Sequence, residues 1–368
     1  MNVSKRQVVL MGAMYTFDST LISVQAQAIG AGKQQVWISH IIAAALIAAS
    51  LWLFSRAASR FPDKTLLEAM VYQRPAAGRM MALLFMAFIF FVLCHDIRMM
   101  TDFSNIILLP LTPLVIIALL VAVTSAVLAM GGLETLGRMT EIYGTILILA
   151  VVISAFIISK DVSYSNLEPF FEYDLKGIAQ AAWLLLPYFG EIIIIPLIVS
   201  FPAGTSFRTL MASLSLGTGF LLLLSMLDLL SIGVPVVSKL MYPSHEMVRQ
   251  IRMTDFLDRF DLVLVGIWLP TMFVKIGYSI FALCYGWKLV LGSRSGRPYV
   301  PSVALLAFVC SFWFFENAVQ LVDFNRIWPA YAIFFQLLLP VLLFFLLRKR
   351  KKEEALPPEG EAARMPGS

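Results

Sequence analysis

The amino-acid sequence predicts an all-α polytopic membrane protein with ten transmembrane helices. Hydrophobic residues make up 60% of the 368 residues and charged residues only 14%, and the mean hydropathy is +0.84. Soluble domains carry about 25% charged residues. An apolar run of about 20 residues is long enough to cross a bilayer as a helix. Such runs lie near residues 7–30, 35–55, 80–101, 113–130, 137–159, 177–200, 209–235, 260–287, 300–321 and 329–347.

The distribution of Lys and Arg predicts the orientation of these helices, because cytoplasmic loops of membrane proteins carry an excess of basic residues. If the N-terminus is inside, 18 basic residues lie in inner segments and 8 in outer segments. We therefore expect both termini to be cytoplasmic. Residues 1–352 are expected to form one transmembrane domain. Residues 353–368, which are rich in Pro, Glu and Ala, are expected to form a disordered cytoplasmic tail.

Two of the apolar runs are interrupted near their middle. The first contains Thr16-Phe-Asp-Ser-Thr20, and the sixth contains Pro187, Gly190 and Glu191. Hydrocarbon tolerates a helix break only where protein or a polar cavity surrounds it. Paired breaks in corresponding halves of a chain are typical of a transporter-type binding site at mid-membrane. The ten spans then divide into two sets of five, and each set starts with a broken helix.

Ionisable residues inside the spans are candidate ligand-binding residues, because a charge in hydrocarbon is costly and usually marks a ligand or ion path. If the first helix unwinds at Phe17–Thr20, Asp18 would receive an ammonium group; alternatively, it caps the second half-helix. Glu191 would contact a ligand or gate a proton, or it would cap the half-helix that follows. Lys275 lies in the middle of the eighth span, so it must be paired or neutral. Arg98, Asp96 and Asp102 are expected to form a structural ion-pair cluster.

A set of short strings, taken in order across roughly residues 5–347, resembles one family. The strings are Trp37-Ile-Ser39, Phe61–Glu68, Arg98 with Leu109–Pro113, Gly132–Arg138, Asn166–Pro169, Tyr188–Glu191, and Tyr242-Pro243 with Phe256–Asp261 and Trp268. The family is the GerAB-type spore germination proteins, the B subunits of bacterial spore germinant receptors. The sequence departs from it in the first-span break, which tends to be small and Gly-rich in relatives but is Phe17–Thr20 here.

The resemblance implies a ten-helix fold of the amino-acid/polyamine/organocation transporter superfamily, with LeuT-like inverted repeats of five helices. It also implies a role in sensing small germinants, often amino acids, beside a larger membrane-bound A subunit and a lipoprotein C subunit. In LeuT-like folds the eighth helix faces the first, with a sodium site between them. We expect the Lys275 ammonium to stand in for sodium and to pair with Asp18 or with carbonyls freed by the break. The alternative is a structural salt bridge without a ligand role.

The same fold class gives roles to side chains of the third and sixth spans. Phe88 and Val92 lie one helical turn apart on the third span, which lines the site in this class, and helix packing is the alternative role. Tyr188 can offer a ring and a hydroxyl to a ligand. The candidate ligand-binding residues are Phe17, Asp18, Ser19, Thr20, Phe88, Val92, Tyr188, Phe189, Gly190, Glu191 and Lys275.

We therefore expect a non-enzymatic sensing subunit of a germinant receptor, in the spore inner membrane or the cell membrane, that binds an amino-acid-like germinant and signals to partner subunits. The alternative is a proton-coupled amino-acid transporter, with Asp18, Glu191 or Lys275 as the proton carrier. The sequence contains no P-loop, HExxH or GxSxG motif, and its three cysteines have no metal-ligand spacing. No cofactor, metal or nucleic-acid partner is expected.

Overall fold

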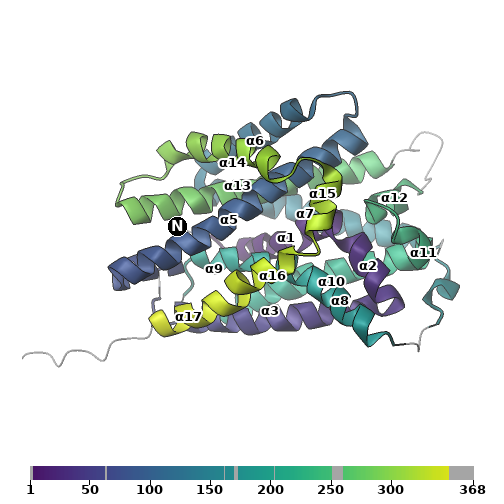
Figure 1. Cartoon of the computed structure of the whole chain (residues 1–368), viewed down its shortest axis with the longest axis horizontal. Coiled ribbons are helices and arrows are strands. Elements are labelled where there is room, and N and C mark those ends of the chain that lie inside the picture. Colours follow the sequence, from purple (N-terminus) through teal and green to yellow (C-terminus); the bar gives the residue numbers. More distant parts are fainter. Residues whose placement is uncertain are drawn as a thin grey trace, which may run out of the picture.

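The long helices run side by side roughly along one direction in the computed structural model of the protein (Figure 1). The structure describes residues 3–62, 64–160, 162–169, 173–202, 204–250 and 260–347. The α-helices in these ranges are α1 (Lys5–Ser23), α2 (Gln25–Gly32), α3 (Val36–Ala58), α4 (Leu66–Gln73), α5 (Pro75–Phe103), α6 (Leu114–Met130), α7 (Gly132–Ile158), α8 (Leu175–Gly190), α9 (Ile194–Ile198), α10 (Ser206–Ile232), α11 (Val234–Val237), α12 (Pro243–Arg249), α13 (Phe260–Leu291), α14 (Val300–Phe314), α15 (Ala318–Phe324), α16 (Trp328–Ile333) and α17 (Leu339–Leu346). The 3-10 and π-helical turns are η1 (Lys33–Gln35), η2 (Ser104–Leu108), η3 (Tyr164–Leu167), η4 (Glu191–Ile193), η5 (Arg297–Tyr299) and η6 (Phe334–Leu338).

The predicted spans correspond to helical stretches of the described chain. Eight of these stretches are long and apolar enough to cross a membrane. The apolar helix α6 and the central helix α1 provide the other two spans, so the prediction of ten is confirmed. The N-terminus and the end of α17 lie at one end of the bundle, and α11 and α12 lie at the other (Figure 1). The proposed tail, residues 353–368, lies outside the described residues.

Helix α1 lies at the centre of the bundle. It begins with a capping box, in which Ser4 and Gln7 each accept a hydrogen bond from the other's backbone N–H. It packs against α7, α8, α10 and α13, and every side chain from Leu10 to Thr20 is buried. Gly217 permits the close approach of α10, because a Cβ there would lie only 2.8 Å from Thr16 Cβ.

The break in the first span lies at Val24, and the expected unwinding at Phe17–Thr20 is wrong. Helix α1 continues to Ser23, and the backbone leaves the helical conformation at Val24, with φ −127° and ψ −8°. The polar side chains of the expected break are compatible with a helix. The hydroxyls of Thr16 and Thr20 each donate to the carbonyl oxygen four residues earlier. The first half-helix is therefore about one turn longer than the sequence indicated.

The break in the sixth span lies where the sequence predicts it, at the junction of α8, η4 and α9. The backbone N–H of Glu191 bonds to the carbonyl of Tyr188. The carbonyl of Pro187, its α-helical partner, is therefore left for another donor. Gln336 in the π-helical turn η6 donates its side-chain N–H to that oxygen at 2.6 Å. Protein groups thus surround the break, as burial in a membrane requires.

Candidate functional site

Lys275 of α13 is the centre of a fully buried group of charged and polar side chains. Its Nζ lies 2.6 Å from Glu191 Oε2 and 3.1 Å from Asp96 Oδ2. Nζ also donates to Ser19 Oγ, which in turn donates to Asp96 Oδ1 at 2.8 Å. The ring of Tyr15 covers the ammonium group, with 5.6 Å between Nζ and the ring centroid. These five residues are called the ion cluster below.

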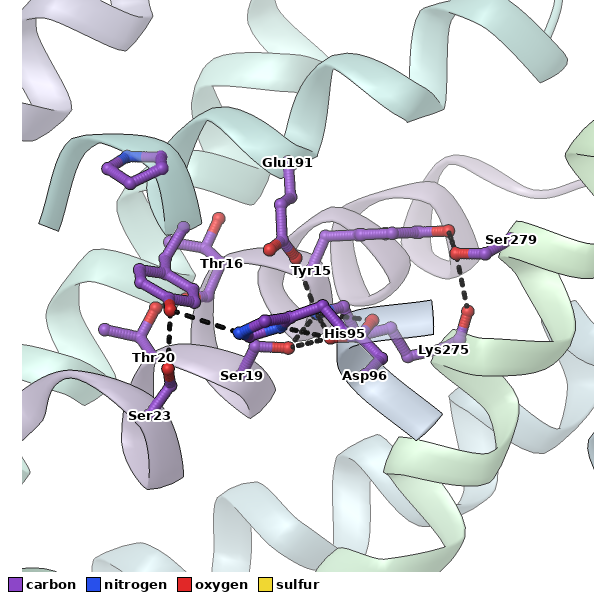
Figure 2. A network of polar contacts seen from close by, with 12 residues as sticks. Tyr15, Thr16, Ser19, Thr20, Ser23, His95, Asp96, Glu191, Lys275 and Ser279 are labelled. Carbon is purple, nitrogen blue, oxygen red and sulfur yellow. Dashed lines mark hydrogen bonds and ion pairs between the residues drawn. The ribbon is translucent and has the colours of Figure 1, made fainter. Parts of the chain in front are cut away.

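The ion cluster joins four transmembrane spans, as Figure 2 shows. Tyr15 and Ser19 lie one turn apart on α1, and Asp96 comes from α5. Glu191 is the first residue of the 3-10 turn η4, so the break in the sixth span carries this carboxylate to the cluster. The first and sixth spans, whose breaks suggested a site, therefore meet the third and eighth spans at this point.

Lys275 is paired, as the sequence predicts, but its partners are not the expected ones. We expected Asp18 or freed carbonyls of the first break, and Nζ instead binds Glu191 and Asp96. Because α1 remains helical here, no carbonyls are freed at this point, and Ser19 is the α1 side chain that bonds to Nζ. Asp18 Oδ1 accepts a hydrogen bond from Thr271 Oγ1 at 3.1 Å. Its Oδ2 has no hydrogen-bond partner among the described residues.

The two capping alternatives for these carboxylates are not observed. Helix α2 begins after Val24 without a side-chain cap hydrogen bond, and η4 begins after Gly190 in the same way. Asp18 and Glu191 instead bind side chains of α13. Both predicted carboxylates therefore face the eighth span, which lies opposite the first span in LeuT-like folds, as the family resemblance implied.

Carboxyl groups outnumber cations in this region. Asp18, Asp96 and Glu191 are at most 1% exposed. Lys275 is the Lys or Arg side chain that contacts them in the described chain, and His95 Nδ1 lies 3.9 Å from Asp96 Oδ1. An uncompensated buried charge costs several kcal/mol. The arrangement therefore favours the uptake of a proton or of a cationic group such as an ammonium.

A second hydrogen-bond network lies at the break in the first span. The hydroxyl of Tyr188 lies 2.5 Å from both Ser23 Oγ and Asn325 Oδ1, and 3.5 Å from His95 Nε2. The side-chain amide of Asn325 donates to the backbone oxygen of Ser23 at 2.8 Å. This oxygen belongs to the last turn of α1, where carbonyls lack helical partners. Tyr188, a predicted ligand residue, thus holds the broken first span to the third span and to the segment after α15.

Phe88 and Val92, the predicted site residues of the third span, are buried side chains that prolong the face of Asp96. Positions 88, 92 and 96 follow at four-residue intervals and share one face of α5. Phe88 stacks on Phe335 and Trp328, with ring centroids 5.2 Å and 6.0 Å apart. Phe88 therefore makes the contacts of helix packing. It lies on the same face of α5 as Asp96, which belongs to the ion cluster.

Three other candidates contact protein groups near the breaks. Gly190 is enclosed by Gln336, whose side chain would lie 2.1 Å from a Cβ at this position. Phe189 lies edge-on to the ring of His40, with 5.9 Å between centroids. The hydroxyl of Thr20 bonds within its own helix. These residues shape the surroundings of the ion cluster without belonging to it.

An apolar pocket of about 80 Å³ lies between α1 and α12, and its wall includes Phe17, the residue before Asp18. A buried water needs roughly 10–15 Å³ of such space, so the pocket has room for several atoms. Phe17 and Trp268 lie in its wall, together with side chains of α7, α10 and α12. The Thr271 hydroxyl lies within hydrogen-bond distance of both the carbonyl oxygen of Trp268 and Asp18 Oδ1, so one residue connects the pocket to this carboxylate. Trp268 Nε1 is buried without a hydrogen-bond partner in the described chain.

Arg98 forms a separate buried ion pair near the end of α5. Its Nε lies 2.9 Å from Asp102 Oδ2, and its guanidinium donates to the carbonyl oxygens of Phe315 and Glu316. We expected Asp96 to join this pair. Residues two apart on a helix point to different sides, and Asp96 binds Lys275 instead. Arg98 thus fixes the segment that connects α14 to α15.

Five residues of the site were not predicted as site members from the sequence: Tyr15, His95, Asp96, Thr271 and Asn325. Asp96 could have been found, because it lies four residues after Val92 on a face already assigned to the site. His95 and Thr271 follow only once the neighbouring helices are placed. Asn325 lies in a connection between helices and had no periodic signal.

Comparison with known proteins assigns the chain to a family. The family model described as spore germination protein matches residues 2–319. The chain belongs to the spore germination protein family. YfkT of Bacillus subtilis (strain 168), whose name assigns it provisionally to spore germination, is 32% identical over 339 residues, covering 92% of this chain and 94% of that protein. Spore germination protein KB of the same organism is 21% identical over 353 residues, covering 92% of each.

Transporters are among the solved structures that this spore germination protein resembles. Mhp1, a nucleobase-cation-symport-1 family transporter in a closed conformation with bromovinylhydantoin bound, gives a TM-score of 0.63 at 14% identity, over 93% of this chain and 77% of that one. A Na⁺-coupled sialic acid symporter gives a TM-score of 0.64 at 13% identity, over 94% of this chain and 78% of that one. A variant of the Eremococcus coleocola manganese transporter gives a TM-score of 0.56 at 11% identity, over 92% of this chain and 78% of that one. The spore germination protein therefore has the LeuT-like fold of two five-helix repeats, each beginning with a broken helix. These neighbours are transporters and not enzymes.

Proposed function

We propose that this spore germination protein is the ligand-sensing membrane subunit of a germinant receptor. It binds a small amino-acid-like germinant at mid-membrane, between the broken first and sixth spans, and signals to a larger membrane A subunit and a lipoprotein C subunit. The observation that carries the proposal is the ion cluster, a buried, carboxylate-rich meeting point of four spans in a member of a germination family. The role is non-enzymatic.

The ammonium group is the part of an amino acid that this region recognises in the proposal. It is chemically equivalent to Lys275 Nζ, which holds Glu191 and Asp96 in the present arrangement. Asp18 Oδ2, without a hydrogen-bond partner in the described chain, accepts the ligand N–H. The apolar pocket beside Phe17 receives the ligand side chain. The carboxylate is left for backbone N–H groups at the breaks, where helix N-termini favour negative charge.

Signalling follows from competition between the ligand ammonium and Lys275. A ligand can shift an equilibrium between two conformations only by its difference in affinity for them. The positive charge of the ligand compensates part of the negative charge of the buried carboxylates. It thereby weakens the ion pair between Lys275 and Glu191. Because Glu191 lies in η4, its release allows the sixth span to move relative to α13. That movement is the change passed to the partner subunits.

The proposed location is the spore inner membrane or the cell membrane, with both termini in the cytoplasm. The N-terminus and the end of α17 lie at the same end of the bundle, as this topology needs (Figure 1). The 18 basic residues of the inner segments against 8 in the outer ones support the orientation. Residues 1–352 form the transmembrane domain and residues 353–368 the tail in this proposal.

A proton-coupled amino-acid transporter is the second candidate function. The transporter fold favours it, and so does the excess of buried carboxyl groups, which a proton can neutralise. Purified protein in liposomes, with an imposed proton gradient and radiolabelled amino acids, distinguishes the two functions. Uptake above that of empty liposomes would favour the transporter and contradict a pure sensor. Binding without uptake is the result expected here.

Germination of spores that carry single variants tests the sensing role. Spores with wild-type protein, Lys275→Ala or Lys239→Ala are exposed to a mixture of the twenty common L-amino acids, and the loss of optical density is followed. Spores without the gene define the background. Lys239 is exposed and lies outside the site. At equal protein levels, we expect Lys275→Ala to abolish the gene-dependent response and Lys239→Ala to keep it. A normal response in Lys275→Ala would contradict the proposal.

A further inference from the structure

A basic groove lies where α3, α10 and α17 meet at one end of the bundle. Its volume is about 790 Å³, within the roughly 300–1,000 Å³ of small-molecule sites. Aromatic rings, guanidinium groups and serine hydroxyls share its wall, and no Asp or Glu lies in it among the described residues. The wall residues that matter here are Trp52, Arg56, Arg60, Phe207 and Phe344. The name basic groove is kept for this site.

Arg56 is the cation that the basic groove offers to a ligand. Its guanidinium carbon lies 5.2 Å from the centroid of the Trp52 ring, and it has no carboxylate partner in the described part of the chain. A ring covers one face of a guanidinium group but leaves the N–H donors along its edge free. Those donors match a phosphate in bidentate geometry. Arg56 is therefore held in place on one side and open to an anion on the other.

Arg60 ties the two sides of the basic groove together. Its guanidinium carbon lies 4.0 Å from the centroid of the Phe344 ring, and its Nη1 donates to the carbonyl oxygen of Phe344 at 2.6 Å. Arg60 lies two residues after the end of α3 and Phe344 is on α17, so these contacts join the end of α3 to α17. Arg60 thus adds positive potential while it has a structural task.

The exposed rings identify the occupant as a lipid headgroup. Trp52 is 44% exposed and Phe207 is 37% exposed, beside the guanidinium of Arg56. Tryptophan is enriched at the boundary between hydrocarbon and headgroups. In the topology proposed above, this end of the bundle lies in the cytoplasmic leaflet, which is anionic. A dissolved phosphate would use the arginine but not the rings, whereas a phospholipid uses both.

We propose that the basic groove binds the phosphate headgroup of an anionic phospholipid, with Arg56 as the main ligand and the acyl chains against Trp52 and Phe207. The bound lipid braces α3, α10 and α17 where they meet. The groove is separate from the ion cluster, so this inference does not depend on germinant binding. Basic pockets between transmembrane helices on the cytoplasmic side are known to suit such headgroups.

The test measures phosphatidylglycerol binding to the purified full-length protein by native mass spectrometry. Arg56→Gln should raise the dissociation constant roughly tenfold, as expected for the loss of a charge-assisted hydrogen bond. Arg56→Lys keeps the charge but lacks the planar set of donors. Its dissociation constant should lie between those of the wild-type protein and Arg56→Gln. Arg79→Gln, a matched change at an exposed arginine on α5 outside the groove, should leave the constant unchanged. The proposal would be overturned if Arg56→Gln bound phosphatidylglycerol as tightly as the wild-type protein, or if Arg79→Gln lost as much affinity as Arg56→Gln.

Thermal unfolding in nanodiscs separates a lipid from a free anion. Discs of equal parts phosphatidylglycerol and phosphatidylcholine should raise the unfolding midpoint of the wild-type protein above that in phosphatidylcholine alone. The rise should shrink in Arg56→Gln and persist in Arg79→Gln. If inorganic phosphate added to phosphatidylcholine discs gives the same rise, the groove is a site for free phosphate and the lipid assignment is wrong. If Arg56→Gln does not fold, Arg56→Lys carries the comparison.

Discussion

Removing the charge of Lys275 should destabilise the protein strongly, because its ion pairs are buried. Lys275→Met leaves Glu191 and Asp96 in the interior without the ammonium that lies 2.6 Å and 3.1 Å away. Loss of one partner of a buried pair costs about 3–5 kcal/mol. Glu191→Gln leaves Lys275 with Asp96 as counter-ion, so a smaller loss of about 1–3 kcal/mol is expected. The double variant should lose less than the sum, with a coupling energy of about 2 kcal/mol.

A solvent-exposed ion pair with the same distance between nitrogen and oxygen provides the matched control. Arg138 Nη2 and Glu134 Oε1 are also 2.6 Å apart, but their side chains are 72% and 63% exposed. An exposed pair four residues apart on a helix contributes about 0.3–0.5 kcal/mol. Both double-mutant cycles are measured by reversible unfolding in detergent micelles, followed by helical circular dichroism. A coupling energy at Lys275 no larger than that of the exposed pair would refute the reasoning from burial.

Two further changes test the packing around the breaks, both by thermal unfolding. Asn325→Ala removes the donor to the Ser23 carbonyl and should cost about 1–3 kcal/mol; an unchanged midpoint would show that the first break is satisfied otherwise. Gly190→Ala places a Cβ within 2.1 Å of the Gln336 side chain and should cost about 1–3 kcal/mol. Gly219→Ala, where no atom lies within 4 Å of the added Cβ, should be neutral or stabilising. Equal effects of the two glycine changes would contradict the close contact.

The number of spans and the break in the sixth were predictable because both have local causes. A run of apolar side chains long enough to cross a bilayer is readable from composition alone. Pro187 removes a backbone N–H, and Gly190 is the position at which a side chain would collide with the tenth span. The first break lacks such a signal. It falls at Val24, without Gly or Pro, and it is stabilised by Asn325, about 300 residues away in the sequence.

The candidate site was predictable in its charges but not in its pairings. Lys275 and Glu191 could be assigned to it because ionisable groups in hydrocarbon need partners. Which groups pair depends on how each helix is rotated, and the polar run of α1 turned out to be helical. Ser19 therefore bonds to Lys275, and Asp18 bonds to Thr271. Asp96 was assigned to Arg98 rather than to Lys275 because proximity in sequence was taken for proximity in space.

The proposed binding of an amino-acid germinant through the buried carboxylates, between the broken first and sixth spans, is tested most directly by ligand binding to Asp18→Asn. The substitution keeps the shape of the side chain and removes a buried charge that contacts no lysine or arginine in the described chain. Equilibrium binding of the radiolabelled amino acid that triggers germination most strongly is measured on purified protein in detergent. We expect at least a tenfold loss of affinity with stability kept or raised. Unchanged affinity in a folded Asp18→Asn protein would contradict this proposal.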